Sequence, residues 1–230
     1  MSKSLLCVTV QAATTAELRA KRDAVVDADL VELRLDSVSD PDVSGALAGR
    51  RTPVIVACHP AWEGGAFTGA EEARRRMLTE ALALGAEYVD VEWKAGFDDV
   101  IARTQGRGIV LSMHDFAGVP ADLGDRMRAM QATGAETVKV AVKANRLSDC
   151  VPLLDLAATA KRDDGVIALA MGPYGLATRA LPSRFGSRWT YAGSITEIDS
   201  PPAASQIFTR LSHPPETIRL PSGVKATPYT

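Results

Sequence analysis

The residues that could do chemistry in this chain are charged side chains placed within valine-rich, strand-like segments. In DLVELRLD, Glu32 and Arg34 alternate with apolar residues. Asp90 and Glu92 alternate with valines in YVDVEW, and Lys139 does so in TVKVAVK. Because the side chains of a strand alternate between its two faces, each segment has one apolar face and one charged face.

Lys139 is the most informative of these residues. A lysine flanked by valines is expected to lose part of its charge through desolvation and nearby cations, and a neutral amine attacks ketones and aldehydes to form an imine. The alternative is a structural ion pair with Glu32 or Asp90, because buried charges are costly unless they are paired. Both interpretations predict a buried network of opposite charges.

His114, Glu63 and Arg179 extend the set of candidates. In LSMHDF, His114 lies at the end of an expected strand, where an imidazole could transfer protons beside an imine or could simply hold a loop. Glu63 lies in CHPAWEGG, and Arg179 lies in MGPYGLATR. An arginine near the start of a helix suits a bidentate contact with a carboxylate.

The elements that must position these residues are alternating β and α segments. The expected helices include residues Thr15–Asp27, Gly69–Leu84, Ala121–Thr133 and Ser148–Lys161, with Thr14, Gly85 and Gly134 as caps. The expected strands are Leu5–Val10, Leu30–Leu35, Val54–Cys58, Tyr88–Glu92, Gly108–Met113, Thr137–Val142, Val166–Ala170 and Trp189–Ala192.

Eight βα units in a chain of 230 residues predict a single-domain (β/α)8 TIM barrel. A doubly wound open sheet is the alternative, but no GxGxxG motif follows the first strand. We expect the barrel to span residues 1–212 and residues 213–230, with four prolines, to form a C-terminal tail. Since helices cover the outside of such a barrel, the charged faces must point into the lumen, where active sites of this fold lie at the carboxyl ends of the strands.

Composition narrows the class of partner. A net charge of −2 argues against nucleic-acid binding, and no apolar run reaches the length of a membrane helix. The first residues do not resemble a signal peptide, and the three cysteines form no CxxC pair, so a cytoplasmic protein is expected.

A metal site is not expected from the sequence. Cys58 and His59 are adjacent in a strand and therefore face opposite ways, so they cannot both join His114 around a zinc ion. Cys58 is expected to be buried packing. The run Arg74–Arg76 lies on a predicted amphipathic helix and is interpreted as a solvated face.

Seven motifs in order carry a resemblance to a known family. These motifs are VELRLD, WEGG, VDVE, SMHDF, KVAVK, MGPYGLATR and FGSRWTYA. Together they resemble type I 3-dehydroquinate dehydratase, the Schiff-base class of the shikimate pathway, from about Leu5 to about Leu211. The resemblance implies a (β/α)8 barrel, a homodimer, and no cofactor or metal.

The resemblance also implies roles for individual residues. Lys139 matches the imine-forming lysine, His114 the general base and acid, and Glu63 the carboxylate that orients the histidine. The remaining matches are Glu32 and Arg34 for the ring hydroxyls and support of the lysine, Asp90 as an acid behind the lysine, Arg179 for the substrate carboxylate and Ser200 in a lid.

Two positions depart from the family pattern. His59 stands where the family has arginine, four residues before the WEGG glutamate. In the lid, Ala204 replaces a glutamine, unless Gln206 substitutes for it after a register shift. Because these groups hold substrate hydroxyls and the carboxylate, their loss predicts lower activity or a modified quinate-like substrate.

Three function classes are left open by the residues. The favoured one is a dehydratase that acts on a small-molecule substrate through the Lys139 imine. The second is a Schiff-base aldolase in the same fold, in which His114 would deprotonate a hydroxyl. The third is a non-catalytic homologue that binds a quinate-like ligand.

Overall fold

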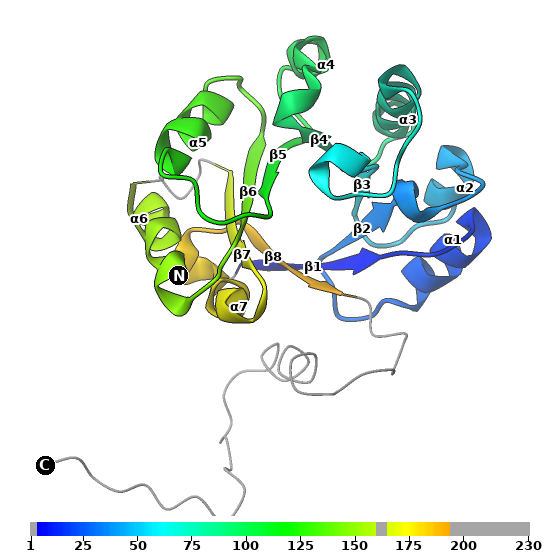
Figure 1. Cartoon of the computed structure of the whole chain (residues 1–230). Coiled ribbons are helices and arrows are strands. Elements are labelled where there is room, and N and C mark those ends of the chain that lie inside the picture. Colours follow the sequence, from blue (N-terminus) through cyan, green and yellow to red (C-terminus); the bar gives the residue numbers. More distant parts are fainter. Residues whose placement is uncertain (1–3, 160–164, 194–230) are drawn as a thin grey trace, which may run out of the picture. The chain divides into compact units, whose positions relative to one another are not determined.

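Segments rich in apolar and β-branched residues form eight parallel strands in the computed structural model, which describes residues 4–159 and 165–193 (Figure 1). Each expected strand is confirmed, with its ends displaced by at most two residues. The strands are β1 (Leu5–Val10), β2 (Leu30–Arg34), β3 (Val54–Ala57), β4 (Tyr88–Glu92), β5 (Ile109–Asp115), β6 (Thr137–Lys143), β7 (Val166–Met171) and β8 (Trp189–Gly193).

The strands form one sheet in the order β7-β6-β5-β4-β3-β2-β1-β8. Between β7 and β8, no ladder joins the described strands, but backbone and side-chain bonds bridge the gap. The Arg188 N–H donates to the Val166 carbonyl at 2.8 Å, and the Ser187 hydroxyl accepts from the Ala168 N–H at 3.0 Å. The sheet is therefore a nearly closed barrel in a single domain, as predicted for a (β/α)8 fold.

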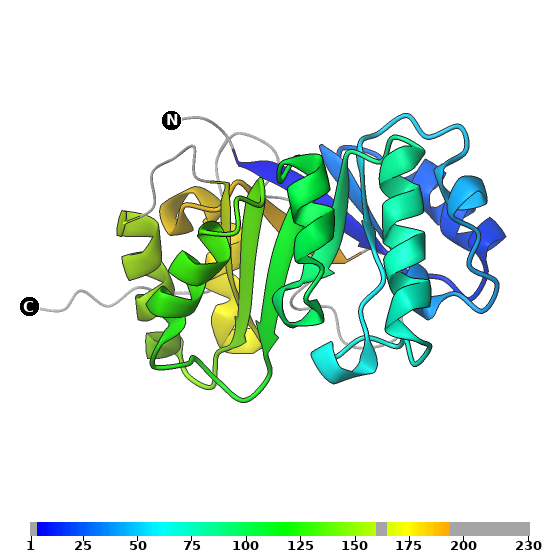
Figure 2. The same cartoon turned by 90° about the horizontal axis from the view of Figure 1, so that it is seen from above.

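Helices follow the strands and cover the outer face of the barrel, as Figure 2 shows for α3, α4 and α5. The α-helices are α1 (Thr15–Ala24), α2 (Val43–Leu47), α3 (Glu71–Ala83), α4 (Asp98–Thr104), α5 (Leu123–Gln131), α6 (Val151–Thr159) and α7 (Leu176–Ala180). Six short 3-10 segments are η1 (Leu35–Ser37), η2 (Ala61–Glu63), η3 (Trp93–Ala95), η4 (Leu147–Cys150), η5 (Pro173–Gly175) and η6 (Pro182–Phe185). Three of the four expected helices are confirmed in shorter form. The fourth, expected over Ser148–Lys161, is present as η4 followed by α6, and its expected end lies outside the described residues.

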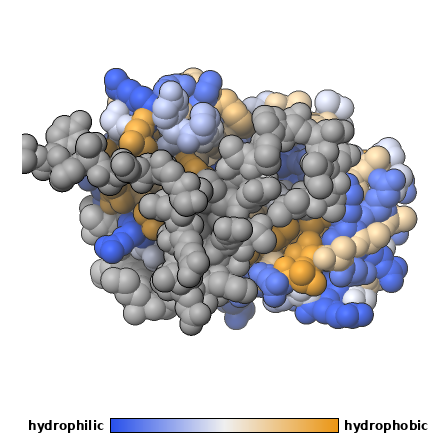
Figure 3. Space-filling model, turned by 90° about the horizontal axis from the view of Figure 1, so that it is seen from below, coloured by the Kyte–Doolittle hydropathy of each residue, from blue (hydrophilic) through white to orange (hydrophobic). Residues whose placement is uncertain are grey.

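The caps explain where the longer helices begin and end. The Thr14 hydroxyl accepts from the Glu17 N–H at 3.3 Å, which satisfies a free donor at the start of α1. Gly85 and Gly134 follow α3 and α5 with φ of 81° each, a left-handed conformation that glycine adopts without strain. On α1, Leu18 is buried, and the outer side of the molecule at this helix is mainly hydrophilic (Figure 3).

Two separate apolar clusters divide the interior. One lies between the sheet and the helices and contains the valines that alternate with the charged residues. The other fills the lower lumen with Leu30, Ile55, Val110, Ile167 and Trp189. The charged faces of the strands therefore point inward, above this apolar floor. None of the helices in the described ranges is long and apolar enough to cross a membrane.

Candidate active site

Lys139 occupies the centre of the lumen on β6. Its side chain is 5% exposed, and Nζ lies 2.5 Å from Asp90 Oδ2 and 3.8 Å from Glu32 Oε1. The ring of Tyr191 on β8 lies 4.9 Å from Nζ, centroid to atom. Asp90 also accepts a hydrogen bond from Ser112, the β5 residue opposite Lys139. The predicted network of opposite charges is present.

The prediction that Lys139 loses part of its positive charge is wrong. Burial disfavours the ammonium, but Asp90 and Glu32 outweigh burial and raise the pKa of Lys139 above its ordinary value. Conversely, burial would raise the pKa of Asp90, but Lys139, His59 and His114 hold it well below its usual range. The valines beside Lys139 predicted its desolvation correctly, and the carboxylates across the lumen reverse the consequence.

His114 lies on β5, one inward-facing position nearer the mouth than Ser112. Burial lowers the pKa of His114, Lys139 and His59 lower it further, and Glu63 opposes the change. No described residue accepts or donates a hydrogen bond at the buried His114 Nδ1. A neutral imidazole with an open nitrogen is the form that can remove a proton.

Glu63 holds the main chain of His114. Its Oε1 accepts the His114 backbone N–H at 2.6 Å and lies 3.6 Å from Nδ1 of the same residue. The carboxylate is buried at the end of η2, in the loop that follows β3. The structure therefore places Glu63 beside His114, as expected, but with the hydrogen bond on the backbone instead of the ring.

Glu32 and Arg34 end β2 with different partners. The Thr9 hydroxyl donates to Glu32 Oε2 at 2.9 Å, while Glu32 Oε1 has no hydrogen-bond partner among the described residues. Arg34 makes a bidentate pair with Asp36 at 2.7 and 2.8 Å. Asp36 also accepts the Ala66 N–H at 3.1 Å, which fixes the loop that carries Glu63. Arg34 therefore pairs locally with Asp36 and not with the carboxylates around Lys139.

His59 follows β3 and is 5% exposed. Its Nδ1 lies 2.6 Å from Glu92 Oε1, and its Nε2 lies 4.0 Å from Asp90 Oδ2. The second oxygen of Glu92 accepts from Arg74, a fully buried residue of α3. The prediction that Arg74 lies on a solvated face is therefore wrong, because its guanidinium points through the barrel wall to a lumen carboxylate. Arg76, two residues further along the helix, is exposed as predicted.

Arg179 approaches the lumen from the last turn of α7, and not from a helix start as expected. Its Nη1 donates to the Tyr191 carbonyl at 3.2 Å, and it makes no ion pair with any described residue. Burial lowers the pKa of Arg179, and Glu32 opposes this. Tyr191 thus contacts both cations, Lys139 with its ring and Arg179 with its carbonyl. Sequence reasoning did not single out this residue, since one aromatic in a strand carries no distinguishing signal.

Three residues bring potential metal ligands together, but an ammonium already neutralises them. Ligand atoms of Glu32, His59 and Asp90 lie within 4.8 Å of one another. Lys139 Nζ contacts both of the carboxylates, so we assign no metal site to this group.

Cys58 lies on the helix side of β3, opposite to His59, and burial raises the pKa of its thiol to about 12. This packing role agrees with the expectation for Cys58.

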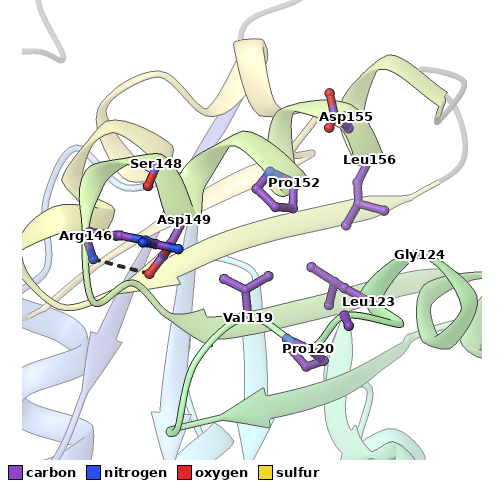
Figure 4. Close-up of a pocket in the computed structure, with 11 residues that line it drawn as sticks. Val119, Pro120, Leu123, Gly124, Arg146, Ser148, Asp149, Pro152, Asp155 and Leu156 are labelled. Atoms are coloured by element: carbon purple, nitrogen blue, oxygen red, sulfur yellow. Dashed lines mark hydrogen bonds and ion pairs between the residues drawn. The ribbon is translucent and has the colours of Figure 1, made fainter.

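A second hollow lies outside the barrel. It has a volume of about 490 Å³ and is formed by residues 119–124 before and within α5 and residues 146–156 of η4 and α6 (Figure 4). Its Arg146 and Asp149 pair with each other at 3.0 Å. None of the lumen residues lines it, so it belongs to another part of the molecule. The lid positions Ser200, Ala204 and Gln206, and the predicted tail, lie outside the described residues.

The fold and the site together define a class: a (β/α)8-barrel protein with a buried lysine and a neighbouring histidine in its lumen. The sequence model of the family described as Type I 3-dehydroquinase matches residues 6–210. The chain belongs to this family, and it is accordingly an enzyme of the hydro-lyase class.

Individual relatives agree with this assignment. The chain is 30% identical to 3-dehydroquinate dehydratase from Desulfotalea psychrophila over 83% of its own length and 88% of that protein. It is 32% identical to a chloroplastic bifunctional 3-dehydroquinate dehydratase/shikimate dehydrogenase from Arabidopsis thaliana, over 82% of this chain and 33% of that longer protein. The crystal structure of 3-dehydroquinate dehydratase from Geobacillus kaustophilus superposes with a TM-score of 0.76 at 26% identity, covering 92% of this chain and 90% of that one.

Proposed function

We propose that this chain dehydrates 3-dehydroquinate to 3-dehydroshikimate through an imine between Lys139 and the substrate ketone. One observation carries the proposal: the Lys139 amine and the His114 imidazole lie on neighbouring strands inside one lumen. Membership of the family, and relatives named 3-dehydroquinate dehydratase, support the choice of substrate.

Imine formation begins when Lys139 loses its proton and its nitrogen attacks the carbonyl carbon. The C–N bond forms, and the carbonyl oxygen leaves as water after it is protonated. The iminium carries the same positive charge as the ammonium, so Asp90 and Glu32 stabilise both species. The carboxylates that raise the pKa of Lys139 therefore also keep the imine protonated, which makes it an electron sink.

His114 is the proposed base for the next step. It takes a proton from the carbon beside the iminium, and the electron pair enters an enamine. The enamine then expels the β-hydroxyl, which accepts the proton from His114 and leaves as water. Hydrolysis of the product iminium releases 3-dehydroshikimate and restores Lys139. The lowered pKa of His114, caused first by burial, keeps the imidazole in its basic form at neutral pH.

The remaining residues are proposed to bind the substrate. Glu32 has a carboxylate oxygen with no hydrogen-bond partner among the described residues, which suits a ring hydroxyl. Arg179 makes no ion pair in the described part of the chain, which suits the substrate carboxylate. Arg34, His59 and Ser200 complete the proposed set, and Glu63 is proposed to orient His114. The chemistry needs no cofactor or metal.

Reductive trapping tests this proposal. The chain is incubated with 3-dehydroquinate, borohydride is added, and the modified peptide is located by mass spectrometry while the absorbance of the conjugated enone is followed. We expect an adduct on Lys139 and formation of the enone. Lys139→Ala abolishes the adduct, whereas Lys143→Ala, which removes an exposed lysine of the same strand, leaves it intact. His114→Ala still forms the imine but lowers turnover by about 10²- to 10⁴-fold.

Other outcomes identify the remaining classes. An adduct whose mass shows a cleaved carbon skeleton would indicate aldolase chemistry. The absence of an adduct with any keto acid would indicate a ligand-binding homologue and would refute the imine. Normal turnover in His114→Ala would refute its role as base.

A modified quinate-like substrate is the second candidate, and the presence of His59 in place of the family arginine favours it. If 3-dehydroquinate is the substrate, the double variant His59→Arg, Ala204→Gln should raise kcat/KM by about one to two orders of magnitude for each restored partner, since each is worth roughly 1–3 kcal/mol. Unchanged or lower activity on 3-dehydroquinate would point to the modified substrate.

Assembly as a homodimer stays a prediction of the family resemblance, and location in the cytoplasm stays a prediction from the first residues and the cysteines. Light scattering coupled to size-exclusion chromatography tests the first, with a mass of twice 24.4 kDa expected for the dimer. A mass of 24.4 kDa at micromolar concentration would contradict it.

A further inference from the structure

A buried histidine and a partly buried histidine, of opposite electrostatic character, meet at the mouth of the barrel. The rings of His59 and His114 contact edge to face, with 5.2 Å between centroids and 73° between planes. His59 follows β3, and His114 lies on β5, so strand β4 with its two carboxylates lies between them in the sheet order. Two imidazoles at this distance do not take up protons independently.

The surroundings of His59 favour its cation. Nδ1 donates to Glu92 at 2.6 Å, which leaves Nε2 facing Asp90 at 4.0 Å. Burial lowers the pKa of His59, but Asp90 and Glu92 outweigh burial and raise it overall. The charged or titratable groups that act on His59 or lie around it are Glu32 and Arg34 on β2, Asp36 on η1, Glu63 on η2, Arg74 on α3, Asp90 and Glu92 on β4, His114 on β5 and Lys139 on β6.

The surroundings of His114 favour its neutral form. The cations of Lys139 and His59 both oppose its protonation, and burial acts in the same direction. Glu63 is the carboxylate beside it, but this group is engaged by the His114 backbone N–H. Arg74 contributes indirectly, because it pairs with Glu92 and so fixes the carboxylate that accepts the hydrogen bond from His59.

We propose that His59 is a positioning residue that stays protonated between Glu92 and Asp90, and that its positive charge keeps His114 neutral and basic. The proposal rests on the proposed function only for the statement that His114 acts as a base. The charge division itself is a property of the free enzyme, so it is measured without substrate.

An NMR titration of the histidines in the full chain tests directly whether His59 is protonated while His114 is neutral. The chain has three histidines, His59, His114 and His213, so single substitutions assign every imidazole signal. In the wild-type enzyme, His59 should remain protonated at a pH at which His114 is neutral. His114 protonating at higher pH than His59 would overturn the proposal.

Two substitutions of His59 separate its charge from its shape. His59→Gln removes the cation and should raise the titration midpoint of His114 by about one pH unit, whereas His59→Arg keeps a cation there and should leave it near the wild-type value. The reciprocal variant His114→Gln should leave the His59 midpoint nearly unchanged, because His114 is already neutral while His59 titrates.

The activity profile gives the second readout. The acid limb of kcat/KM should move to higher pH in His59→Gln by the same amount as the His114 midpoint, and it should stay in place in His59→Arg. A purely structural role would lower kcat/KM in His59→Gln at every pH without moving the limb or the midpoint, and this result would refute the proposal. Failure of the imine test would leave the NMR result intact, so the two proposals fail separately.

Discussion

At the scale of single residues, the charge of Lys139 depends on partners that lie two strands away. Its neighbours in sequence are valines, and these alone predict a neutral amine. Asp90 lies on β4 and Lys139 on β6, with Ser112 of β5 between them and hydrogen-bonded to Asp90. The residues were identifiable from the alternation of charge and valine. The pairing was not, because it depends on the register between non-consecutive strands.

Replacing Asp90 should lower the pH at which Lys139 becomes reactive. In Asp90→Asn the largest interaction that raises the pKa of Lys139 is lost, so burial lowers this pKa and the free amine appears at lower pH. We expect the pH of half-maximal trapping by a small aldehyde and cyanoborohydride, followed by mass spectrometry at Lys139, to fall by at least about one unit.

Ser112→Ala is the matched control for Asp90→Asn. It removes a neutral donor to the same carboxylate and leaves every charge in place. Its trapping profile should stay within about 0.3 pH units of the wild type, since Lys139, His59 and His114 hold the pKa of Asp90 well below its usual range and the carboxylate keeps its charge without this bond. If both variants shift equally, the charge of Asp90 does not control Lys139.

At the scale of elements, α3 is attached to the barrel by a buried cation. Arg74 is fully buried, its guanidinium lies 5.0 Å from the ring centroid of Phe97, and it pairs with both Glu71 and Glu92. This contact joins a helix on the outside of the barrel to the carboxylate that binds His59. The helix therefore supports the site as well as the fold.

Removing Arg74 should destabilise the chain strongly. Arg74→Met keeps most of the side-chain volume but leaves Glu92 as a buried charge with one fewer partner, a loss of about 3–5 kcal/mol in the free energy of unfolding. Arg76→Ala on the exposed side of the same helix should cost less than about 0.5 kcal/mol. Urea unfolding followed by circular dichroism measures both, and equal losses would show that Arg74 contributes no more than a surface residue.

The elements themselves were predictable to the extent that their patterns are long. Each strand is an apolar run of four to seven residues, and in β2, β4 and β6 charged residues alternate with the apolar ones; all eight strands were found. Helices α2, α4 and α7 have only five to seven residues, less than two turns, so no amphipathic period identifies them.

The burial of Arg74 was missed for a related reason. Three consecutive arginines point in three directions around the helix, and the sequence does not say which one faces the sheet.

At the scale of the whole molecule, the barrel follows from repetition. Eight βα units with right-handed crossovers place each strand beside the previous one, which gives the observed order from β1 to β7. Closure at β8 depends on other contacts. β8 pairs with β1 from Leu5 to Thr9, while its junction with β7 is made by Arg188 and Ser187, which precede the strand. A serine in a connecting segment gives no signal of this role in the sequence.

The junction of β7 and β8 should be the weakest line of the described barrel. The Ser187 hydroxyl accepts from the Ala168 N–H and donates to the Ala168 carbonyl, so Ser187→Ala leaves two buried backbone groups unpaired. We expect a loss of about 1–3 kcal/mol in the free energy of unfolding. Hydrogen exchange should quicken in peptides that cover β7 and β8 and stay unchanged in β3 and β4, because the opening starts at the junction and the opposite wall keeps its ladders.

Ser39→Ala is the matched control, because it removes an exposed hydroxyl bonded to the Ala13 carbonyl. It should alter neither the free energy of unfolding nor the exchange rates. Uniformly faster exchange in Ser187→Ala would mean that the barrel opens as one cooperative unit and that this junction is no weaker than the rest.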